Sequence, residues 1–365
     1  MTGFDQSIIR IVLFIGILGV LVVIHEVGHF VTARLAGVRV LEFGIGFPPR
    51  ARVLRSKGET LYTLNWLPIG GFVKLEGEDG DQADDPRSFA SQGLFTKLWI
   101  LVAGVLMNLL LAFVIFTGIA LYGDPTIGER VVAVEPGSPA AAAGFVPGDV
   151  IASVDGQHYG AFSGGSLLLD LRARPGETVT LGIEHADGTE SSVVVTLRDQ
   201  ATIDAGKGAV GFTREPTTTR TAIHYGVVEA IRLGAERTIG ALGLIVGGLG
   251  TLVESVATNP TAPPPVSGPV GIATQIGDVF WQLGPVFTLY IAGALSANLA
   301  VVNILPFPPL DGGRMLMITL KRLFGTRISL RAEQLTYMVG FVFLFAFLIW
   351  ITGFDIIRSL GGAGT

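Results

Sequence analysis

Long apolar stretches separated by polar segments dominate the pattern of this chain. A helix needs about 20 apolar residues to span a hydrocarbon core about 30 Å thick. Four stretches meet this length, and they cover residues 8–31, 98–122, 285–305 and 335–354. The stretch 98–122 contains no charged residue. The pattern therefore predicts four transmembrane helices.

A fifth stretch, residues 238–253, is shorter and richer in glycine. Five of its 16 residues are Gly, which makes it a weak helix former. Charged residues alternate with apolar ones at helical spacing just before it, at Glu229, Arg232, Glu236 and Arg237. This pattern is typical of a helix that lies in the membrane interface. We therefore predict that residues 223–254 lie on the membrane or dip into it, without crossing.

Composition supports a membrane protein and excludes several classes of function. Of 365 residues, 49% are hydrophobic and only 15% are charged, whereas soluble domains carry about 25% charged residues. The net charge of −5 gives no general attraction for nucleic acid. The absence of cysteine excludes disulfides, thiolate nucleophiles and Cys-ligated metals. A metal site can use only Asp, Glu and the five histidines.

The distribution of positive charge predicts the orientation, because Lys and Arg favour the cytoplasmic loops. The loop 306–334 contains five of them, Arg314, Lys321, Arg322, Arg327 and Arg331. Each terminal tail contains one. With four spans, residues 306–334 and 32–97 are cytoplasmic, and both termini and residues 123–284 lie on the other side.

Residues 126–200 have the pattern of a small β-rich domain. Valine-rich runs at 131–134 and 150–154 are strand-like, and Asp155-Gly156 is a turn dipeptide. The run from Pro136 to Ile151 resembles the core of a bacterial PDZ domain. PDZ domains bind extended peptides by adding a strand to a sheet edge. A purely structural β-domain is the alternative.

Two other segments connect the predicted spans. Residues 40–75 have the pattern of β-hairpin strands on the cytoplasmic side. Backbone this apolar and non-helical can enter a membrane only where protein covers it or where it lines a cavity. Residues 201–284 are interpreted as a linker that contains the interfacial helix and a stiff, proline-rich connector over 258–269, with five prolines.

The candidate chemistry lies near the end of the first span. His25-Glu26-Val27-Gly28-His29 fits the pattern H-E-x-x-H. Residues four apart share one helix face, so the two imidazoles can bind one zinc ion while Glu26 acts on a water beside it. Ionisable groups in an apolar span are costly and need partners. The alternatives are a structural cluster of polar residues and a helix end that is exposed to water at the membrane interface.

A third ligand has to come from elsewhere, and Asp311 is the best candidate. It follows a proline-broken helix end and precedes two glycines, in the sequence from Asn303 to Gly313. Taken alone, it is equally an ordinary turn aspartate. The four-span topology favours a metal, because it places Asp311 in the same leaflet as His25 and His29. A crossing by 238–253 would move Asp311 to the opposite face.

The H-E-x-x-H motif together with the Asn303-to-Gly313 motif resembles the site-2 protease family of intramembrane zinc metalloproteases, in its bacterial RseP-like branch. The room for only one PDZ domain departs from RseP itself. The resemblance implies that His25, His29 and Asp311 bind zinc and that Glu26 is the general base. It also implies that Asn303 binds the substrate backbone, for which a helix-packing amide is the alternative.

The expected fold is a polytopic α-helical membrane protein with four transmembrane helices, a membrane-associated β-hairpin region and an inserted PDZ domain. Its domains are 1–125 and 285–365 in the membrane, 126–200 as the PDZ-like domain, and the linker 201–284. The expected function is intramembrane proteolysis in the bacterial inner membrane. The resemblance implies transmembrane substrates already cut by another protease, such as anti-sigma factors or signal-peptide remnants, and no nucleic acid. A non-catalytic PDZ-bearing scaffold and a metal transporter are the alternatives.

Overall fold

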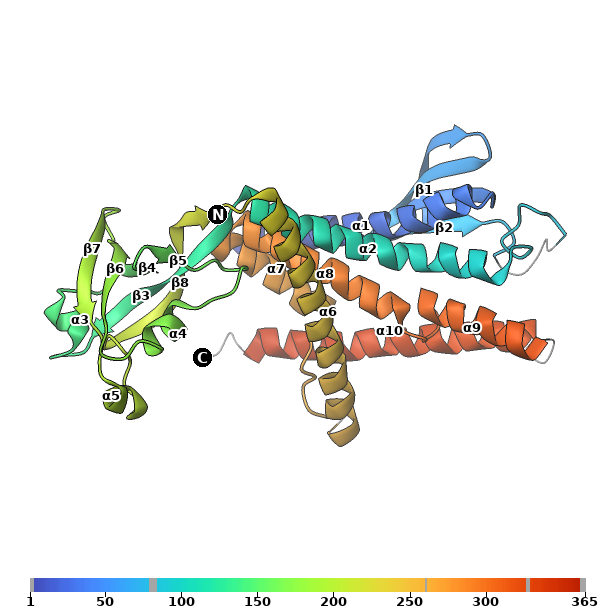
Figure 1. The fold of residues 1–365 in the computed structure, drawn as a ribbon. Coiled ribbons are helices and arrows are strands. Elements are labelled where there is room, and N and C mark those ends of the chain that lie inside the picture. The colour runs from blue at the N-terminus through green and yellow to red at the C-terminus, as the bar shows by residue number, and fades with distance from the viewer. Residues whose placement is uncertain (1–2, 79–83, 260, 326–328, 362–365) are drawn as a thin grey trace. The chain divides into compact units, whose positions relative to one another are not determined.

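The structure, a computed structural model, describes residues 3–78, 84–259, 261–325 and 329–361 (Figure 1). The chain forms two compact units. The first, called the membrane unit, comprises Met1–Ile115 and Thr238–Thr365. The second, called the inserted unit, comprises Phe116–Arg237.

Five helices in the described residues are long and apolar enough to cross a membrane. They are α1 (Gly3–Leu35), α2 (Leu94–Tyr122), α6 (Val227–Thr258), α8 (Pro285–Ile304) and α10 (Leu330–Gly361). Four correspond to the four predicted spans. The fifth, α6, covers the segment predicted to be interfacial, and it is continuous despite its glycines. The chain is therefore a membrane protein with several apolar helices, and the number that cross remains a prediction.

Glycine allows α1 and α2 to approach each other closely. A Cβ atom on Gly28 of α1 would lie 2.5 Å from the carbonyl oxygen of Ala103 in α2. A Cβ atom on Gly104 of α2 would lie 2.5 Å from Nε2 of His29 in α1. Small residues have the same use in many membrane helix pairs, where they let backbones pack without an intervening side chain.

A short helix, α7 (Pro269–Leu283), closes the end of the membrane unit that lies opposite His25 and His29. Its Asp278 Oδ1 lies 2.7 Å from Nη2 of Arg10, near the start of α1. At its other end, the N–H of Gly271 donates to Asp355 of α10 at 2.8 Å. Residues 269–283, which the sequence analysis placed in the linker, thus pack onto both helices.

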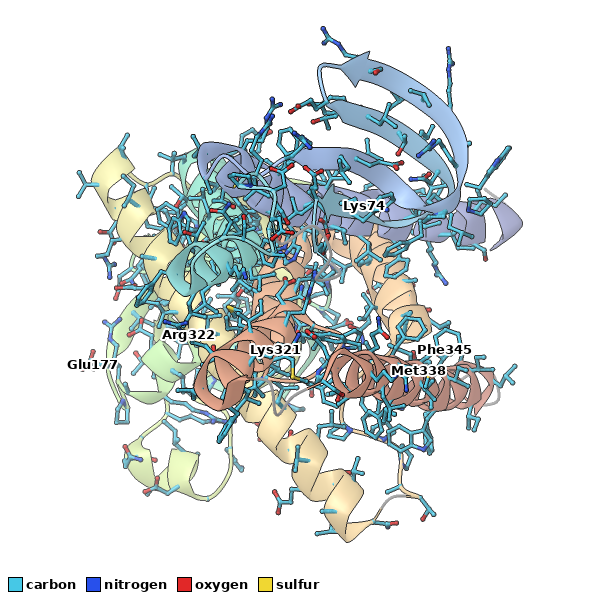
Figure 2. All side chains as sticks on the ribbon, turned by 90° about the vertical axis from the view of Figure 1, so that its right-hand side faces the viewer. Lys74, Glu177, Lys321, Arg322, Met338 and Phe345 are labelled. Atoms are coloured by element: carbon cyan, nitrogen blue, oxygen red, sulfur yellow. The ribbon has the colours of Figure 1, made fainter. Side chains whose placement is uncertain are left out.

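Two long strands, β1 (Val40–Lys57) and β2 (Thr60–Leu75), form an antiparallel sheet where the hairpin region is predicted. The first half of β1 lies between the two halves of β2, because Phe43 is opposite both Tyr62 and Val73. Residues 71–75 pair on one side with β1, and no other described strand pairs with them. They are therefore an edge of the sheet. Figure 2 shows this curved sheet and labels Lys74 on this edge.

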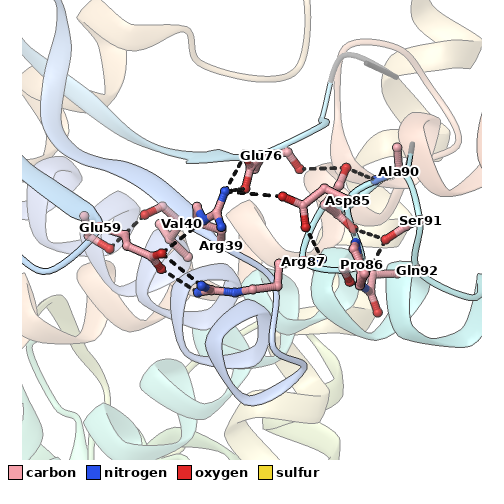
Figure 3. A network of polar contacts seen from close by, with 12 residues as sticks. Arg39, Val40, Glu59, Glu76, Asp85, Pro86, Arg87, Ala90, Ser91 and Gln92 are labelled. Atoms are coloured by element: carbon pink, nitrogen blue, oxygen red, sulfur yellow. Dashed lines mark hydrogen bonds and ion pairs between the residues drawn. The ribbon is translucent and has the colours of Figure 1, made fainter. Parts of the chain in front are cut away.

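A network of ion pairs holds the base of this sheet (Figure 3). Arg39, just after α1, lies 2.6 Å from Oε2 of Glu76 at the end of β2 and 3.4 Å from Oδ2 of Asp85. It also lies 3.3 Å from Oε1 of Glu59 in the β1–β2 turn. Glu59 pairs in addition with the exposed Arg87 at 2.5 Å. The network joins the end of α1, the sheet and the loop before α2.

Helix α9 (Asp311–Phe324) follows α8 after a short proline-rich turn and is connected to α10. Lys321 of α9 forms an ion pair with Glu333 of α10. The side chains of Met338 and Phe345 on α10 are exposed, as expected for a face that meets lipid (Figure 2).

The inserted unit contains a six-stranded antiparallel sheet with the order β7-β6-β4-β3-β8, in which β5 pairs with β4. The strands are β3 (Asp124–Val134), β4 (Val150–Val154), β5 (Gln157–His158), β6 (Thr178–Glu184), β7 (Glu190–Thr196) and β8 (Phe212–Ile223). Three short helices, α3 (Pro139–Ala142), α4 (Leu167–Arg172) and α5 (Gln200–Asp204), complete it. Its core is built around Val131, Ile151, Leu171, Leu181 and Val195.

The structure extends this β-rich unit beyond the predicted range 126–200. Residues 212–223, which the sequence analysis placed in the linker, form β8 and pair with β3 over its whole length. The last turns of α2 and the first turns of α6 also belong to this unit, where Ala120 packs against Ala230 and Leu233.

Candidate metal centre

Three predicted metal ligands from distant parts of the chain lie together in the membrane unit. Nε2 of His25 lies 3.0 Å from Oδ2 of Asp311 and 3.1 Å from Nε2 of His29. Nε2 of His29 lies 3.4 Å from the same carboxylate oxygen. The two histidines are buried and Asp311 is half-buried. In the part of the chain that the structure describes, this is the only group of three such side chains with the spacing of a metal site.

The spacing of these three atoms fits zinc. Tetrahedral zinc has bonds of about 2.0–2.1 Å to nitrogen and oxygen, which places neighbouring ligand atoms about 3.3 Å apart. Two imidazoles and a carboxylate are also a usual donor set for zinc. Three ligand atoms that face one another at such distances repel when all of them present lone pairs, so a cation between them would relieve the repulsion.

Local structure explains why these side chains converge. His25 and His29 are four residues apart in α1 and therefore share one face. Asp311 is the first residue of α9. The two glycines after it allow the turn to fold back, because a Cβ atom on Gly312 would collide with the carbonyl oxygen of Ile304 at the end of α8.

Helix α2 contacts both imidazole rings at Nδ1, the nitrogen that faces away from Asp311. Nδ1 of His29 lies 2.8 Å from the carbonyl oxygen of Ile100. Nδ1 of His25 lies 3.4 Å from the side-chain amide of Asn108. The sequence alone did not decide the role of α2, because neither a backbone carbonyl nor a lone Asn in an apolar span has a recognisable motif.

Glu26 is half-buried and lines a cavity of about 160 Å³. His29 and Asp311 line the same cavity, together with Phe72 and Val73 of the sheet edge. Gly71 at the start of this edge lies against Glu26, since a Cβ atom there would be 3.5 Å from Cγ of Glu26. The candidate base, two of the three candidate ligands and the free edge of β2 therefore share one cavity.

Sequence reasoning missed a cation in the wall of this cavity. Arg314, one turn after Asp311, pairs with Glu78 at 2.5 Å, and both residues line the cavity. Burial would lower the pKa of Arg314, but its neighbours, Glu78 first and then Asp311, together raise the pKa above its usual value. The sequence showed Arg314 only as one of the positive charges that set orientation.

Asn303, the predicted substrate-binding residue, lies in the last turn of α8 and is half-buried. It is not among the residues that line the described cavity. Its role stays a prediction.

Comparison with known proteins shows the family of this chain. The model of the family described as "Peptidase family M50" matches residues 13–347, which include both motifs. A candidate zinc metalloprotease of Clostridium acetobutylicum is 31% identical over 97% of this chain and 99% of its own length. The zinc metalloprotease RasP of Geobacillus kaustophilus is 28% identical over 96% and 98% of the two chains.

A candidate zinc metalloprotease of Brucella suis is 29% identical over 93% of this chain and 92% of its own length. These similarities define a zinc-dependent peptidase of the site-2 type, embedded in the membrane through apolar helices. The chain belongs to peptidase family M50.

Proposed function

We propose that this metalloprotease hydrolyses peptide bonds within or near transmembrane segments, with His25, His29 and Asp311 as the zinc ligands and Glu26 as the general base. The observation that carries the proposal is the convergence of the three ligand atoms within 3.0–3.4 Å, beside Glu26 and inside a helical membrane unit. Zinc, when bound, makes a water more acidic and polarises a carbonyl.

The residues of the chain supply the proton transfers. The Glu26 carboxylate takes a proton from the attacking water and later delivers it to the leaving amine. Its place in the cavity, next to the candidate ligands, suits both steps. Arg314 is in the same wall, but its pairing with Glu78 leaves it a structural cation in this account.

A transmembrane substrate has to unwind before hydrolysis, because helical hydrogen bonds protect its amides. We propose that residues 71–75 bind the unwound segment as an added strand. Their free edge and their position beside Glu26 support this role. Asn303 would hold the substrate backbone at the end of α8.

We propose that four helices cross the membrane and that α6 makes no net crossing. Helix α2 starts at the metal centre, where Ile100 contacts His29, and it runs away from it. Helix α8 begins at the opposite end, next to α7, and returns to Asp311. The chain from 123 to 284 therefore leaves from and returns to the same side.

A crossing by α6 would require residues 259–268 to cross back. This segment contains four prolines, and its described residues, 259 and 261–268, form no helix. Its polar backbone would lack hydrogen-bond partners in lipid. We therefore retain the inner membrane orientation predicted from charge, with the metal centre towards the cytoplasm and the inserted unit outside.

We propose that the inserted unit is a PDZ-like domain that selects substrates. Its strand β8 is an edge strand, and the residues near its start, 213–216, are exposed. Such an edge can receive an extended peptide. The substrates proposed are transmembrane proteins already shortened by another protease, such as anti-sigma factors or signal-peptide remnants.

Replacement of Glu26 by Gln tests the proposed base. In proteoliposomes that contain a transmembrane reporter, Glu26→Gln should keep its zinc and lose about 10²–10⁴-fold in cleavage rate. The exposed Glu190→Gln in the inserted unit is the matched control and should cleave like the wild type. Wild-type cleavage by Glu26→Gln would remove Glu26 from the mechanism.

A further inference from the structure

Asn108 is the most deeply buried polar side chain next to the metal centre. It lies in the middle of α2 and has no exposed surface. The rest of the stretch 98–122 carries no charge and is strongly apolar. A buried amide without hydrogen bonds is costly in such a setting, so its partners should explain its presence.

The hydrogen bonds of Asn108 point to His25 and leave one atom without a partner. Its amide nitrogen lies 3.4 Å from Nδ1 of His25. Its Oδ1 is buried and has no donor among the described residues. The backbone at this position is anchored separately, because Oγ of Ser296 in α8 donates to the carbonyl oxygen of Asn108 at 2.8 Å.

The position of His25 determines which hydrogen bond is needed. Its Nε2 faces Nε2 of His29 and the carboxylate of Asp311, so it has to offer a lone pair to a metal. A neutral imidazole then carries its proton on Nδ1, which requires an acceptor. A half-turn of the Asn108 carboxamide exchanges its two terminal atoms and brings Oδ1 to that proton. This orientation also gives the buried oxygen its donor.

His29 has the same arrangement with a different acceptor. Its Nδ1 lies 2.8 Å from the carbonyl oxygen of Ile100, two turns earlier in α2. Metal-bound histidines usually donate their second N–H to such an acceptor, which fixes the ring and its tautomer. Helix α2 thus provides one acceptor for each imidazole.

We propose that Asn108 is a positioning residue of the metal centre, whose side-chain oxygen accepts the Nδ1 proton of His25 and directs its Nε2 to the metal. The inference rests on the proposed role of His25 as a ligand. Asn108 itself touches neither metal nor substrate in this account. A packing role alone would require only the volume of the side chain.

Two substitutions of Asn108 distinguish a role as hydrogen-bond acceptor from a role in packing alone. Asn108→Leu keeps a similar volume and removes the acceptor, whereas Asn108→Asp keeps an acceptor at the same place. Thr288→Val is the matched control, because Thr288 is a buried polar residue of α8 whose hydroxyl donates to the carbonyl oxygen of Gly284, just before that helix, and to no candidate ligand among the described residues. The readout is the zinc dissociation constant of the full-length protein in detergent, measured by competition with a chelator.

We expect Asn108→Leu to weaken zinc binding about 10–100-fold, the usual effect of losing such a partner. Asn108→Asp and Thr288→Val should stay within about threefold of the wild type. Wild-type affinity in the Leu variant, or equal losses in the Leu and Asp variants, would overturn the proposal.

A measurement on the wild type covers the case in which the Leu variant does not fold. In ¹⁵N-histidine spectra of the zinc-loaded protein, His25 should be protonated at Nδ1 and metal-bound at Nε2. A His25 bound through Nδ1 would overturn the inference while leaving the zinc site in place. A wild type that binds no zinc would instead refute the proposed metal site itself.

Discussion

Gly104 shows how little room the metal centre leaves around its histidines. A Cβ atom at this position would lie 2.5 Å from Nε2 of His29 and 2.6 Å from Cε1 of His25. Both contacts are closer than real Cβ atoms approach, and the two rings are packed edge to face with centroids 4.7 Å apart. A methyl group would therefore displace the rings from one another.

We predict that Gly104→Ala lowers zinc affinity at least about tenfold and lowers cleavage with it, since misplacement of a ligand by a few tenths of an ångström is enough to weaken a metal site. Gly118→Ala on the same helix is the matched control, because nothing lies within 4 Å of its added Cβ. Chelator competition gives the affinities. Equal zinc affinity in the two variants would show that the rings can move aside without loss.

At the scale of single residues, the sequence singled out His25, Glu26, His29 and Asp311, and their roles stay predictions. His25 and His29 share a helix face by spacing alone, and Asp311 was chosen from the topology and the motif around it. The sequence did not decide the role of Asn108, and it gave no sign of the pairing of Arg314 with Glu78. Each depends on a neighbour that is far away in the sequence, His25 in one case and Glu78 in the other.

At the scale of elements, Arg39 links the end of α1 to the β1–β2 sheet through its ion pairs. Glu76 is buried, and Arg39 supplies its charged partner at 2.6 Å. Loss of the guanidinium would leave that carboxylate unpaired, at a cost of about 1–3 kcal/mol. The edge 71–75 directly precedes Glu76, so its position should be affected first.

We predict that Arg39→Gln speeds limited proteolysis within residues 40–75 and raises the KM for a transmembrane substrate. Arg87→Gln is the control, because its pair with Glu59 is exposed and such pairs contribute little. Equal proteolysis of both variants would mean that the sheet is held by its packing on α1 and not by the network in Figure 3.

Elements with an apolar pattern were predicted well, and elements without one were missed. The strand β8 is rich in threonine and contains Pro216, so it has no alternation of apolar and polar residues. Its pairing with β3 is a tertiary effect. The glycines of α6 indicated a weak helix. Apolar surroundings nevertheless favour a helix, because a helix satisfies all of its backbone hydrogen bonds internally.

At the scale of the whole molecule, the division into two units predicts that selection and hydrolysis are separable. Asp124 and Ile223 are paired residues, as are Pro125 and Ala222. The start of β3 and the end of β8 are therefore adjacent, and residues 126–221 can be replaced by a link of two glycines. Removal of 126–200 alone would leave β8 without its partner.

We predict that this shortened protein binds zinc like the full chain and cleaves a wider range of transmembrane reporters, including ones with large outer domains. Zinc content and a panel of reporters of graded size measure the two effects. Retained zinc with unchanged selectivity would refute the proposed PDZ-like role. Loss of zinc would show that the inserted unit is needed for the membrane unit to fold.

The most direct test of the central claim is the zinc content of the purified protein and its Asp311→Ala variant, determined by elemental analysis. Asp311 comes from a helix far in sequence from His25 and His29, so it reports on the assembled site. The account predicts about one zinc per wild-type chain and a large loss in Asp311→Ala with the helical content unchanged. A wild type without zinc, or a variant that keeps the full amount, would contradict it.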